Sequence, residues 1–169
     1  AGSFRDTDFA DLDQKRFDDT FNLNVRGYLF AAQAFAALVQ PGQANASIVC
    51  VGSTNSLAAE KNSVIYDSSK GAVLMLIRSL AVTLAPRGIR VNGIGPGIID
   101  TPLTSAGLAA PGVRDALLAQ IPLGKIGQPV DIGGAAVFLA SPQASYITGQ
   151  MLYIDGGILA NQMTWEVRT

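Results

Sequence analysis

Three residues whose side chains can take part in proton transfer lie close together in the sequence. Ser53 follows an apolar run, Tyr66 comes 13 residues later, and Lys70 lies four residues beyond the tyrosine. A tyrosine and a lysine at positions i and i+4 of a helix share one face and can act together. The sequence has no histidine, the commonest general acid or base. Proton chemistry must therefore use a phenol, an amine or a carboxylate.

A phenol is a poor base near neutral pH because its ordinary pKa is about 10. An ammonium group within about 4–6 Å stabilises the phenolate and can lower that pKa by roughly 1–3 units. We therefore expect Lys70 to lower the pKa of Tyr66. The alternative is that the two residues form an exposed helical pair and that Ser53 only makes the turn at the end of a strand.

The composition restricts the class of protein. The 169 residues are 49% apolar and 15% charged, which predicts one globular domain. A net charge of −1 gives no reason to expect a nucleic acid or an anionic membrane as partner. The longest apolar stretch, residues 28–39, is too short to span a bilayer and is expected to be a buried helix.

The single cysteine, Cys50, excludes a disulfide within the chain, and no Cys/His cluster is present to hold zinc. Cys50 lies in a strand-like apolar run, where we expect a buried filler rather than a reactive thiol. A reducing cytoplasmic location fits this use of cysteine.

Helical and strand patterns alternate along the chain. We expect helices over 13–40, 63–84, 115–121 and 131–139, and short strands over 47–51, 89–94 and 150–154. This alternation predicts an α/β fold with right-handed βαβ units and a parallel sheet.

The two long helices have small or apolar residues almost all round, at 27–39 and 71–84. A helix without a wide polar face is buried on two sides. We therefore expect a homo-oligomer, a dimer or a tetramer, in which these helices pack across a two-fold axis. The alternative is that another part of the same chain covers them.

Six groups of residues resemble motifs of the short-chain dehydrogenase/reductase family, in the family's order and at its usual spacings. They are Asn24-Val-Arg-Gly27, Ser53, Tyr66-x-x-x-Lys70, Arg90-Val-Asn92, Pro96-Gly97-Ile98-Ile99-Asp100-Thr101, and Ile147-Thr-Gly-Gln150 followed by Asp155-Gly156-Gly157. The resemblance extends to about residue 160.

The resemblance implies a three-layer, doubly wound, Rossmann-like parallel sheet, of which this chain holds the last three strands and their helices. Residues 1–169 would then be the C-terminal catalytic part of a single domain, without the N-terminal half that binds the dinucleotide. Ala1-Gly2 resembles the end of the family's Asn-Ala-Gly motif. The glycines at 93, 95 and 97 do not replace the missing glycine-rich turn, because Pro96 lacks the N–H that a phosphate needs; we interpret them as a turn and a site of close backbone approach.

The resemblance further implies an oxidoreductase that uses NAD or NADP and interconverts a secondary alcohol and a carbonyl compound by hydride transfer. The implied catalytic residues are Asn24, Ser53, Tyr66 and Lys70. Among them, Ser53 and Tyr66 would contact the substrate oxygen. Asn24 would hold, through its helix backbone, a water that links Lys70 to solvent; alternatively its side chain bonds its own backbone.

The implied cofactor-binding residues are Tyr66, Lys70, Pro96, Gly97, Ile99 and Thr101. Thr101 could also be the N-cap of a short helix. Asp67 is expected to be a solvated charge. In the family, the substrate is selected largely by the segment after Thr101, here 102–120, and by the tail from 158. A second hypothesis is that this chain is a catalytically incompetent fragment, or a truncated subunit that acts only through oligomer contacts.

Overall fold

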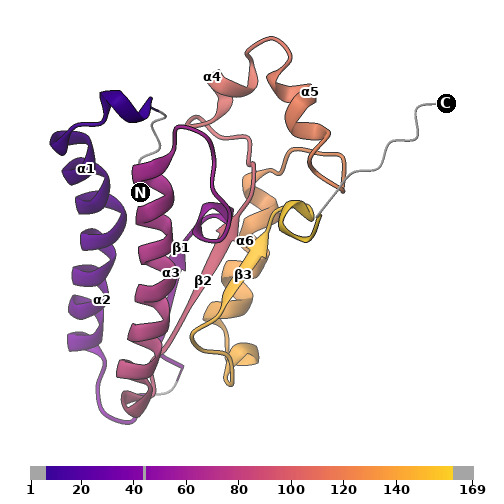
Figure 1. Cartoon of the computed structure of the whole chain (residues 1–169). Coiled ribbons are helices and arrows are strands. Elements are labelled where there is room, and N and C mark those ends of the chain that lie inside the picture. Colours follow the sequence, from indigo (N-terminus) through magenta and orange to yellow (C-terminus); the bar gives the residue numbers. More distant parts are fainter. Residues whose placement is uncertain (1–6, 44, 162–169) are drawn as a thin grey trace.

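The computed structural model describes residues 7–43 and 45–161, and its centre is a parallel sheet (Figure 1). The strands are β1 (Ser47–Val51), β2 (Arg90–Pro96) and β3 (Met151–Ile154), in the order β1–β2–β3. Both pairs are parallel, with Cys50 opposite Gly93 and Gly93 opposite Met151. The predicted α/β fold with a parallel sheet is confirmed, and the predicted strands differ from the observed ones by no more than two residues at either end.

One long helical segment precedes β1. It consists of α1 (Gln14–Phe21), a π-helical turn (Asn22–Arg26) and α2 (Gly27–Leu38). The predicted helix over 13–40 is confirmed in extent, but the π-turn was not expected. Such a turn holds one extra residue inside a helix and is frequent at functional sites.

The helix α3 (Val64–Leu84) connects β1 to β2, and α6 (Pro129–Ala140) lies between β2 and β3. Two short helices precede α6, α4 (Ser105–Leu108) and α5 (Val113–Leu118), of which α4 was not predicted. Short 3₁₀ turns occupy Phe9–Asp11, Thr54–Ser56, Ala85–Arg87, Pro142–Ala144 and Ile158–Ala160. The predicted contribution of the tail to the substrate site lies partly outside the described residues, from 162 onward.

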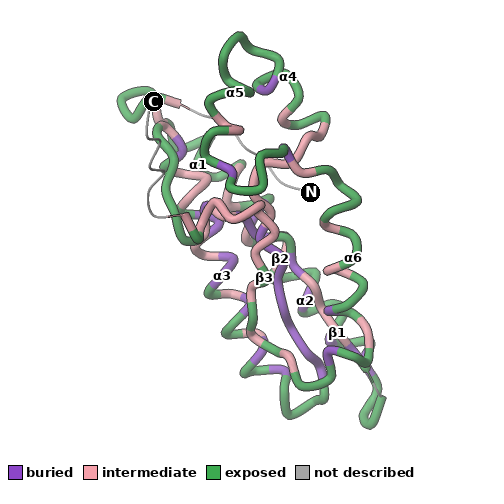
Figure 2. Tube along the Cα trace, turned by 90° about the vertical axis from the view of Figure 1, so that its right-hand side faces the viewer, coloured by how far each residue is buried: buried purple, intermediate pink, exposed green. Residues whose placement is uncertain are grey.

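The helices α3 and α6 lie on opposite faces of the sheet. Figure 1 shows α3 in front of the strands and α6 behind them, and the view turned by 90° in Figure 2 places the two helices on either side of β2 and β3. The helices α1 and α2 pack against α3. The connection from β1 to β2 and the one from β2 to β3 move in the same direction across the sheet, but α3 and α6 cover opposite faces of it. One connection is therefore right-handed and the other left-handed. The expectation of right-handed units therefore holds for only one of the two.

The core lies between α3 and the sheet. Val73, Ile77, Ile89 and Val91 are all at most 1% exposed, and purple segments in Figure 2 follow β2 through the centre of the molecule. Cys50 belongs to the same cluster, and burial raises the pKa of its thiol to about 11. A thiol with such a pKa is a weak nucleophile, in agreement with a packing role.

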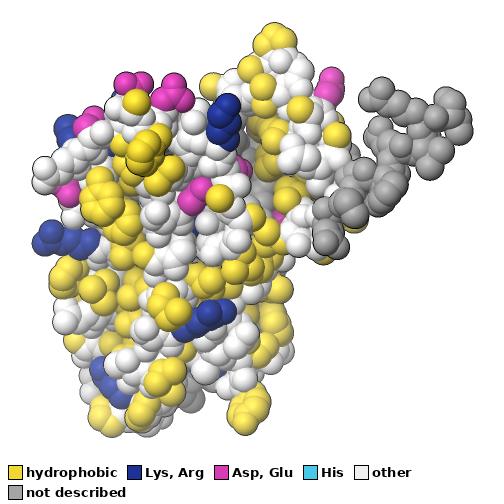
Figure 3. Space-filling model, viewed as in Figure 1, with side chains coloured by type: hydrophobic (Ala, Val, Ile, Leu, Met, Phe, Trp, Pro, Cys, Tyr) yellow, Lys and Arg dark blue, Asp and Glu magenta, His cyan; other side chains and the backbone are white. Residues whose placement is uncertain are grey.

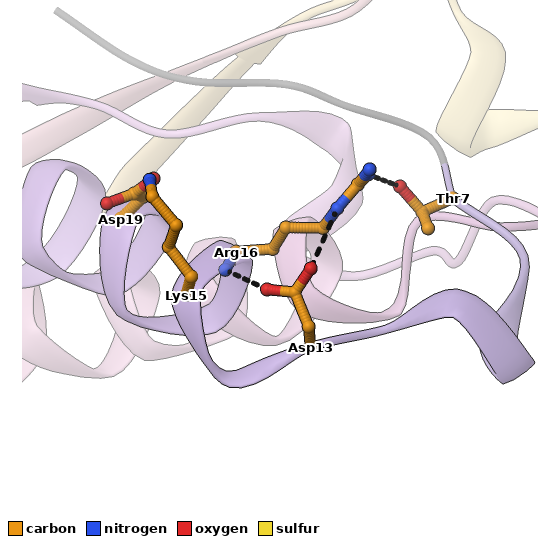
Figure 4. Close-up of polar contacts among 5 residues, drawn as sticks. All are labelled: Thr7, Asp13, Lys15, Arg16 and Asp19. Atoms are coloured by element: carbon orange, nitrogen blue, oxygen red, sulfur yellow. Dashed lines mark hydrogen bonds and ion pairs between the residues drawn. The ribbon is translucent and has the colours of Figure 1, made fainter.

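The start of α1 is fixed by local polar contacts (Figure 4). The carboxylate of Asp13, the N-cap, accepts from the backbone N–H of Arg16 at 2.7 Å. The guanidinium of Arg16 returns to Asp13 at 3.3 Å and also contacts the hydroxyl of Thr7. These contacts hold the segment before α1 against the first turn of the helix.

The motif Arg90-Val-Asn92 has structural roles in β2. Arg90 donates to the carbonyl oxygens of Leu139 and Ser141, at the end of α6, at 2.8 and 3.1 Å. Asn92 is fully buried; its Nδ2 donates to the carbonyl of Ile147 at 2.7 Å, and its Oδ1 accepts from the backbone N–H of Gln150 at 3.0 Å. The central strand therefore fixes both the end of α6 and the loop that enters β3.

The glycines in β2 and directly after it allow close packing. A Cβ at Gly93 would lie 2.6 Å from Cδ1 of Ile77, and one at Gly97 would lie 2.8 Å from the Cα of Asp155. Gly93 and Gly95 lie inside the strand, so the expectation of a turn there is wrong.

Replacing Asn92 by leucine, which has a similar size, should lower the free energy of unfolding by about 1–3 kcal/mol, because the carbonyl of Ile147 and the N–H of Gln150 both lose their partner, the fully buried amide of Asn92. Urea unfolding of the purified protein measures this. A change below about 0.5 kcal/mol, the size expected of an ordinary surface substitution, would show that these contacts do not hold the loop.

Candidate functional site

The carboxyl ends of the three strands meet at one edge of the sheet, where parallel α/β proteins place their ligands. The residues after β1 and β2 are fixed there by backbone hydrogen bonds. The N–H of Gly52 donates to the carbonyl of Ile94 at 2.7 Å, and that of Gly97 donates to the carbonyl of Ile154 at 3.0 Å. Ser53 and the Pro96-Gly97 pair therefore come to adjacent positions.

An open cleft of about 430 Å³ lies at this edge. Its walls come from the ends of β1 and β2, from α2 and α3, from the loop after β2 and from the start of α6. Seven of the eight residues singled out from the sequence line it: Ser53, Tyr66, Lys70, Pro96, Gly97, Ile99 and Thr101. The structure thus brings together residues that lie up to 48 positions apart in the sequence.

The eighth residue, Asn24, lies behind the cleft in the π-turn. It is fully buried, and its Nδ2 donates to the hydroxyl of Ser69 at 3.0 Å. That hydroxyl donates to the carbonyl of Tyr66 at 2.7 Å. Asn24 therefore contacts the turn of α3 that carries the tyrosine and the lysine.

The amine of Lys70 is held under the ring of Tyr66. Its Nζ lies 5.5 Å from the ring centroid and donates to the carbonyl oxygen of Val51 at 3.2 Å. The side chain of Lys70 is almost fully buried. The spacing of four residues on α3 places both groups on one helix face, so the expectation of an exposed pair is excluded.

Burial dominates the ionisation of this pair. It lowers the pKa of Lys70 from 10.5 to about 8, because the ammonium loses its water. Burial also raises the pKa of Tyr66, against a hydrogen bond with Ser53 that acts to lower it, while the charges of Glu60 and Asp67 raise it further. The expectation that Lys70 lowers the pKa of Tyr66 does not hold in this structure, in which the amine loses its proton before the phenol.

Two cleft residues were missed by the sequence reasoning. Tyr28 lines the cleft, and its hydroxyl donates to the carbonyl of Val51 at 3.1 Å. It follows Asn24 by four residues on one helical segment, and that spacing was the available signal. Thr104, and not Thr101, is the N-cap of α4; its hydroxyl donates to the carbonyl of Ile99 at 2.6 Å and accepts from the N–H of Thr101 at 3.0 Å.

The arrangement can exchange a proton with a ligand oxygen. The Tyr66 phenol keeps its proton at neutral pH, since the ordinary pKa of a phenol is already about 10 and burial raises that of Tyr66, so it can donate to an oxygen that enters the cleft. The hydroxyl of Ser53 lies beside it and can form a second hydrogen bond to that oxygen. Pro96, Gly97 and Ile99 give the cleft an apolar wall.

Known proteins resemble this chain in sequence and in fold. A family model described as enoyl-(acyl carrier protein) reductase matches residues 1–159. The chain is 36% identical over 154 residues to an L-rhamnose-1-dehydrogenase of Scheffersomyces stipitis, covering 91% of this chain and 60% of that protein. It is 35% identical over 159 residues to a 3-oxoacyl-[acyl-carrier-protein] reductase of Thermotoga maritima, covering 94% of this chain and 63% of that one.

A solved structure shows the same similarity in fold. The structure of a gluconate 5-dehydrogenase from Burkholderia cenocepacia, in complex with NADP and tartrate, superposes with a TM-score of 0.88 at 30% identity. The superposition covers 95% of this chain and 63% of that one. The chain therefore spans about three fifths of the length of these relatives. Together, the matched residues and the shared fold show that the chain belongs to the short-chain dehydrogenase/reductase family.

Proposed function

We propose that the protein carrying this chain is an NAD(P)-dependent oxidoreductase, which interconverts a secondary alcohol and a carbonyl compound by hydride transfer. The observation that carries the proposal is the meeting of Ser53, Tyr66 and Lys70 in one cleft at the carboxyl edge of the sheet. The names of two relatives, an L-rhamnose-1-dehydrogenase and a gluconate 5-dehydrogenase with bound NADP, support the same reaction class and cofactor.

The residues of the cleft fit a nicotinamide. Pro96, Gly97 and Ile99 offer an apolar wall for a flat ring, and the hydroxyl of Thr101 and the amine of Lys70 offer hydrogen bonds to its polar groups. When bound, NAD or NADP supplies or accepts the hydride. We assign the contacts with the nicotinamide half of the cofactor to these five residues together with Tyr66.

The proton follows a separate route through the side chains of the chain itself. In carbonyl reduction Tyr66 donates its phenolic proton to the substrate oxygen, and in alcohol oxidation it takes the proton back. Ser53 hydrogen-bonds the same oxygen and stabilises the charge that develops on it. Lys70, with a pKa of about 8, restores the proton of the tyrosine. Asn24 holds, through the backbone of the π-turn, the water that links Lys70 to solvent.

The remaining parts of the proposal concern partners and location. The substrate is a small molecule, bound near the apolar segment 102–120. Exposed apolar side chains on α2 and α3 (Leu29, Phe30, Leu38, Met75 and Val82) support a homo-oligomer through these helices, and Figure 3 shows hydrophobic side chains spread over this side of the molecule. The segment Val64–Arg87 is long and apolar enough to cross a membrane, but it packs on β2 and contributes to the core. We propose a cytoplasmic protein, which the single, buried cysteine supports.

Replacing Tyr66 by phenylalanine should lower turnover by about 10²-fold or more, because the ring over Lys70 remains while the proton donor is lost. Initial rates with NADH and NADPH, measured on a panel of ketones and secondary alcohols in the whole protein, test this. Tyr146→Phe is the matched control, since Tyr146 is fully exposed and precedes β3, away from the carboxyl edge. Full activity in Tyr66→Phe would exclude the mechanism.

Replacing Lys70 by methionine should raise the free energy of unfolding at pH 7 by about 1–3 kcal/mol, since a pKa lowered from 10.5 to about 8 corresponds to a burial penalty of roughly 3 kcal/mol. The carbonyl of Val51 keeps Tyr28 as its donor. In the unmodified protein the unfolded chain binds more protons between these two pKa values, so stability rises with pH there. The advantage of the variant is therefore complete below about pH 8 and disappears toward pH 10.5. Denaturant unfolding across this range measures it, and a less stable variant at pH 7 would contradict the burial penalty.

The second candidate function concerns the 169-residue chain by itself, which would act through oligomer contacts and not as an enzyme. The exposed apolar side chains of α2 and α3 favour it. We expect the purified chain to show no micromolar binding in fluorescence titrations with NADH and NADPH, and to form dimers or larger species in light scattering. Micromolar binding would refute the incompetence of the isolated chain, and a stable monomer would refute the role in oligomer contacts.

A further inference from the structure

Behind Ser53 lies a line of side chains that the proposed mechanism does not use. Ser53 contacts Asn55, and Asn55 contacts Asp67, the residue that follows Tyr66 on α3. Asn55 is buried and Asp67 is half-buried. The expectation that Asp67 is a solvated charge is therefore wrong: its carboxylate is held inside the loop between β1 and α3.

Asp67 determines which way the amide of Asn55 faces. Its carboxylate accepts from Nδ2 of Asn55 at 2.8 Å and from the backbone N–H of Glu60 at 3.0 Å. An ionised carboxylate has no proton to donate, so the amide must turn its NH₂ group toward Asp67. The Oδ1 of Asn55 therefore faces Ser53, at 3.0 Å from its Oγ.

This amide orientation in turn fixes the hydroxyl of Ser53. An amide oxygen only accepts, so Ser53 donates its proton to Oδ1, while the backbone N–H of Asn55 donates to Oγ at 3.2 Å. Two contacts with one residue thus hold Oγ and leave it a lone pair toward Tyr66, with which it hydrogen-bonds. Without them the side chain could occupy three staggered rotamers, of which one has this position.

We propose that Asp67 is a positioning residue, which acts through the amide of Asn55 to fix the Oγ of Ser53 beside Tyr66. The proposal rests on the proposed function, in which Ser53 hydrogen-bonds the substrate oxygen. Asp67 does not line the cleft, so its effect on the position of Oγ passes through Asn55.

Asp67→Asn is the principal test, because it keeps the shape of the side chain and changes its polarity. Nδ2 of Asn55 and the N–H of Glu60 donate to different oxygens of the carboxylate, so an amide in the same place turns its NH₂ group toward one of these two donors. A misplaced group of this kind can cost up to about 100-fold in rate, so we expect kcat to fall about tenfold while KM changes less. Asn55→Ala should lower kcat at least as much. Because Asp67 acts on Oγ through Asn55, adding Asp67→Asn to Asn55→Ala should have no further effect on kcat at the optimum pH of each variant.

Glu60→Gln is the matched control for charge. The groups that act on the phenol of Tyr66 are Glu60, Asp67, Tyr28 and the amine of Lys70. Both Glu60→Gln and Asp67→Asn remove a negative charge that raises the pKa of Tyr66, so both should move the pH profile of kcat/KM to lower pH. Only Asp67→Asn should lower kcat at the optimum pH of the variant itself, since the contact with Asn55 belongs to Asp67.

Two kinetic outcomes would overturn the proposal: an unchanged kcat in Asp67→Asn, or additive losses in the double variant. Nuclear magnetic resonance of the Asn55 side-chain amide gives a readout that needs no turnover. Its protons should exchange with water faster in Asp67→Asn than in the unmodified protein, and equal exchange would also overturn the proposal. Failure of the proposed function is distinct, because it appears as full activity in Tyr66→Phe.

Discussion

The carbonyl oxygen of Val51, at the end of β1, joins the elements on which the cleft depends. It accepts from Nζ of Lys70 at 3.2 Å and from the hydroxyl of Tyr28 at 3.1 Å, so α3 and α2 are tied to the same strand end. The position of that strand end is set by the pairing of Val51 with Ile94 of β2. Ser53 follows two residues later and is placed by the same pairing. The geometry of the cleft is thus a consequence of sheet register more than of local helix propensity.

The burial of the Lys70 amine and the Tyr66 phenol beside this strand end lowers the stability of the fold. An amine and a phenol are both withdrawn from water, and each responds by favouring its neutral form. In water the phenol, with an ordinary pKa of 10.0, loses its proton before the amine at 10.5; in the cleft this order is reversed. A core position could be filled by an apolar residue without this penalty. Ionisable groups buried beside a cleft are typical of functional sites, where stability is given up for reactivity.

Much of the fold could be predicted because its signals are local. Apolar runs predicted the strands, and Gly and Pro residues predicted most of the helix ends. The π-turn could not be predicted, since one extra residue leaves the apolar composition of the helix unchanged. Motifs at strand and helix ends predicted many of the residues that line the cleft, but they did not predict which hydrogen bonds the polar side chains make. Asp67 and Thr104 show the reason: whether a polar side chain faces solvent or a neighbouring loop depends on contacts made across the fold.

The π-turn between α1 and α2 determines where this segment can change in length. Removing one residue from Asn22–Arg26 would restore a regular helix, because the turn is a local widening that takes in one extra residue. The helices on either side would keep their relative orientation, and the hydroxyl of Tyr28 would stay near the carbonyl of Val51. A deletion inside α2 itself would instead turn the two parts of that helix apart by about 100°, the rotation that each residue contributes to an α-helix. The position of a deletion, more than its size, therefore decides whether the wall of the cleft survives.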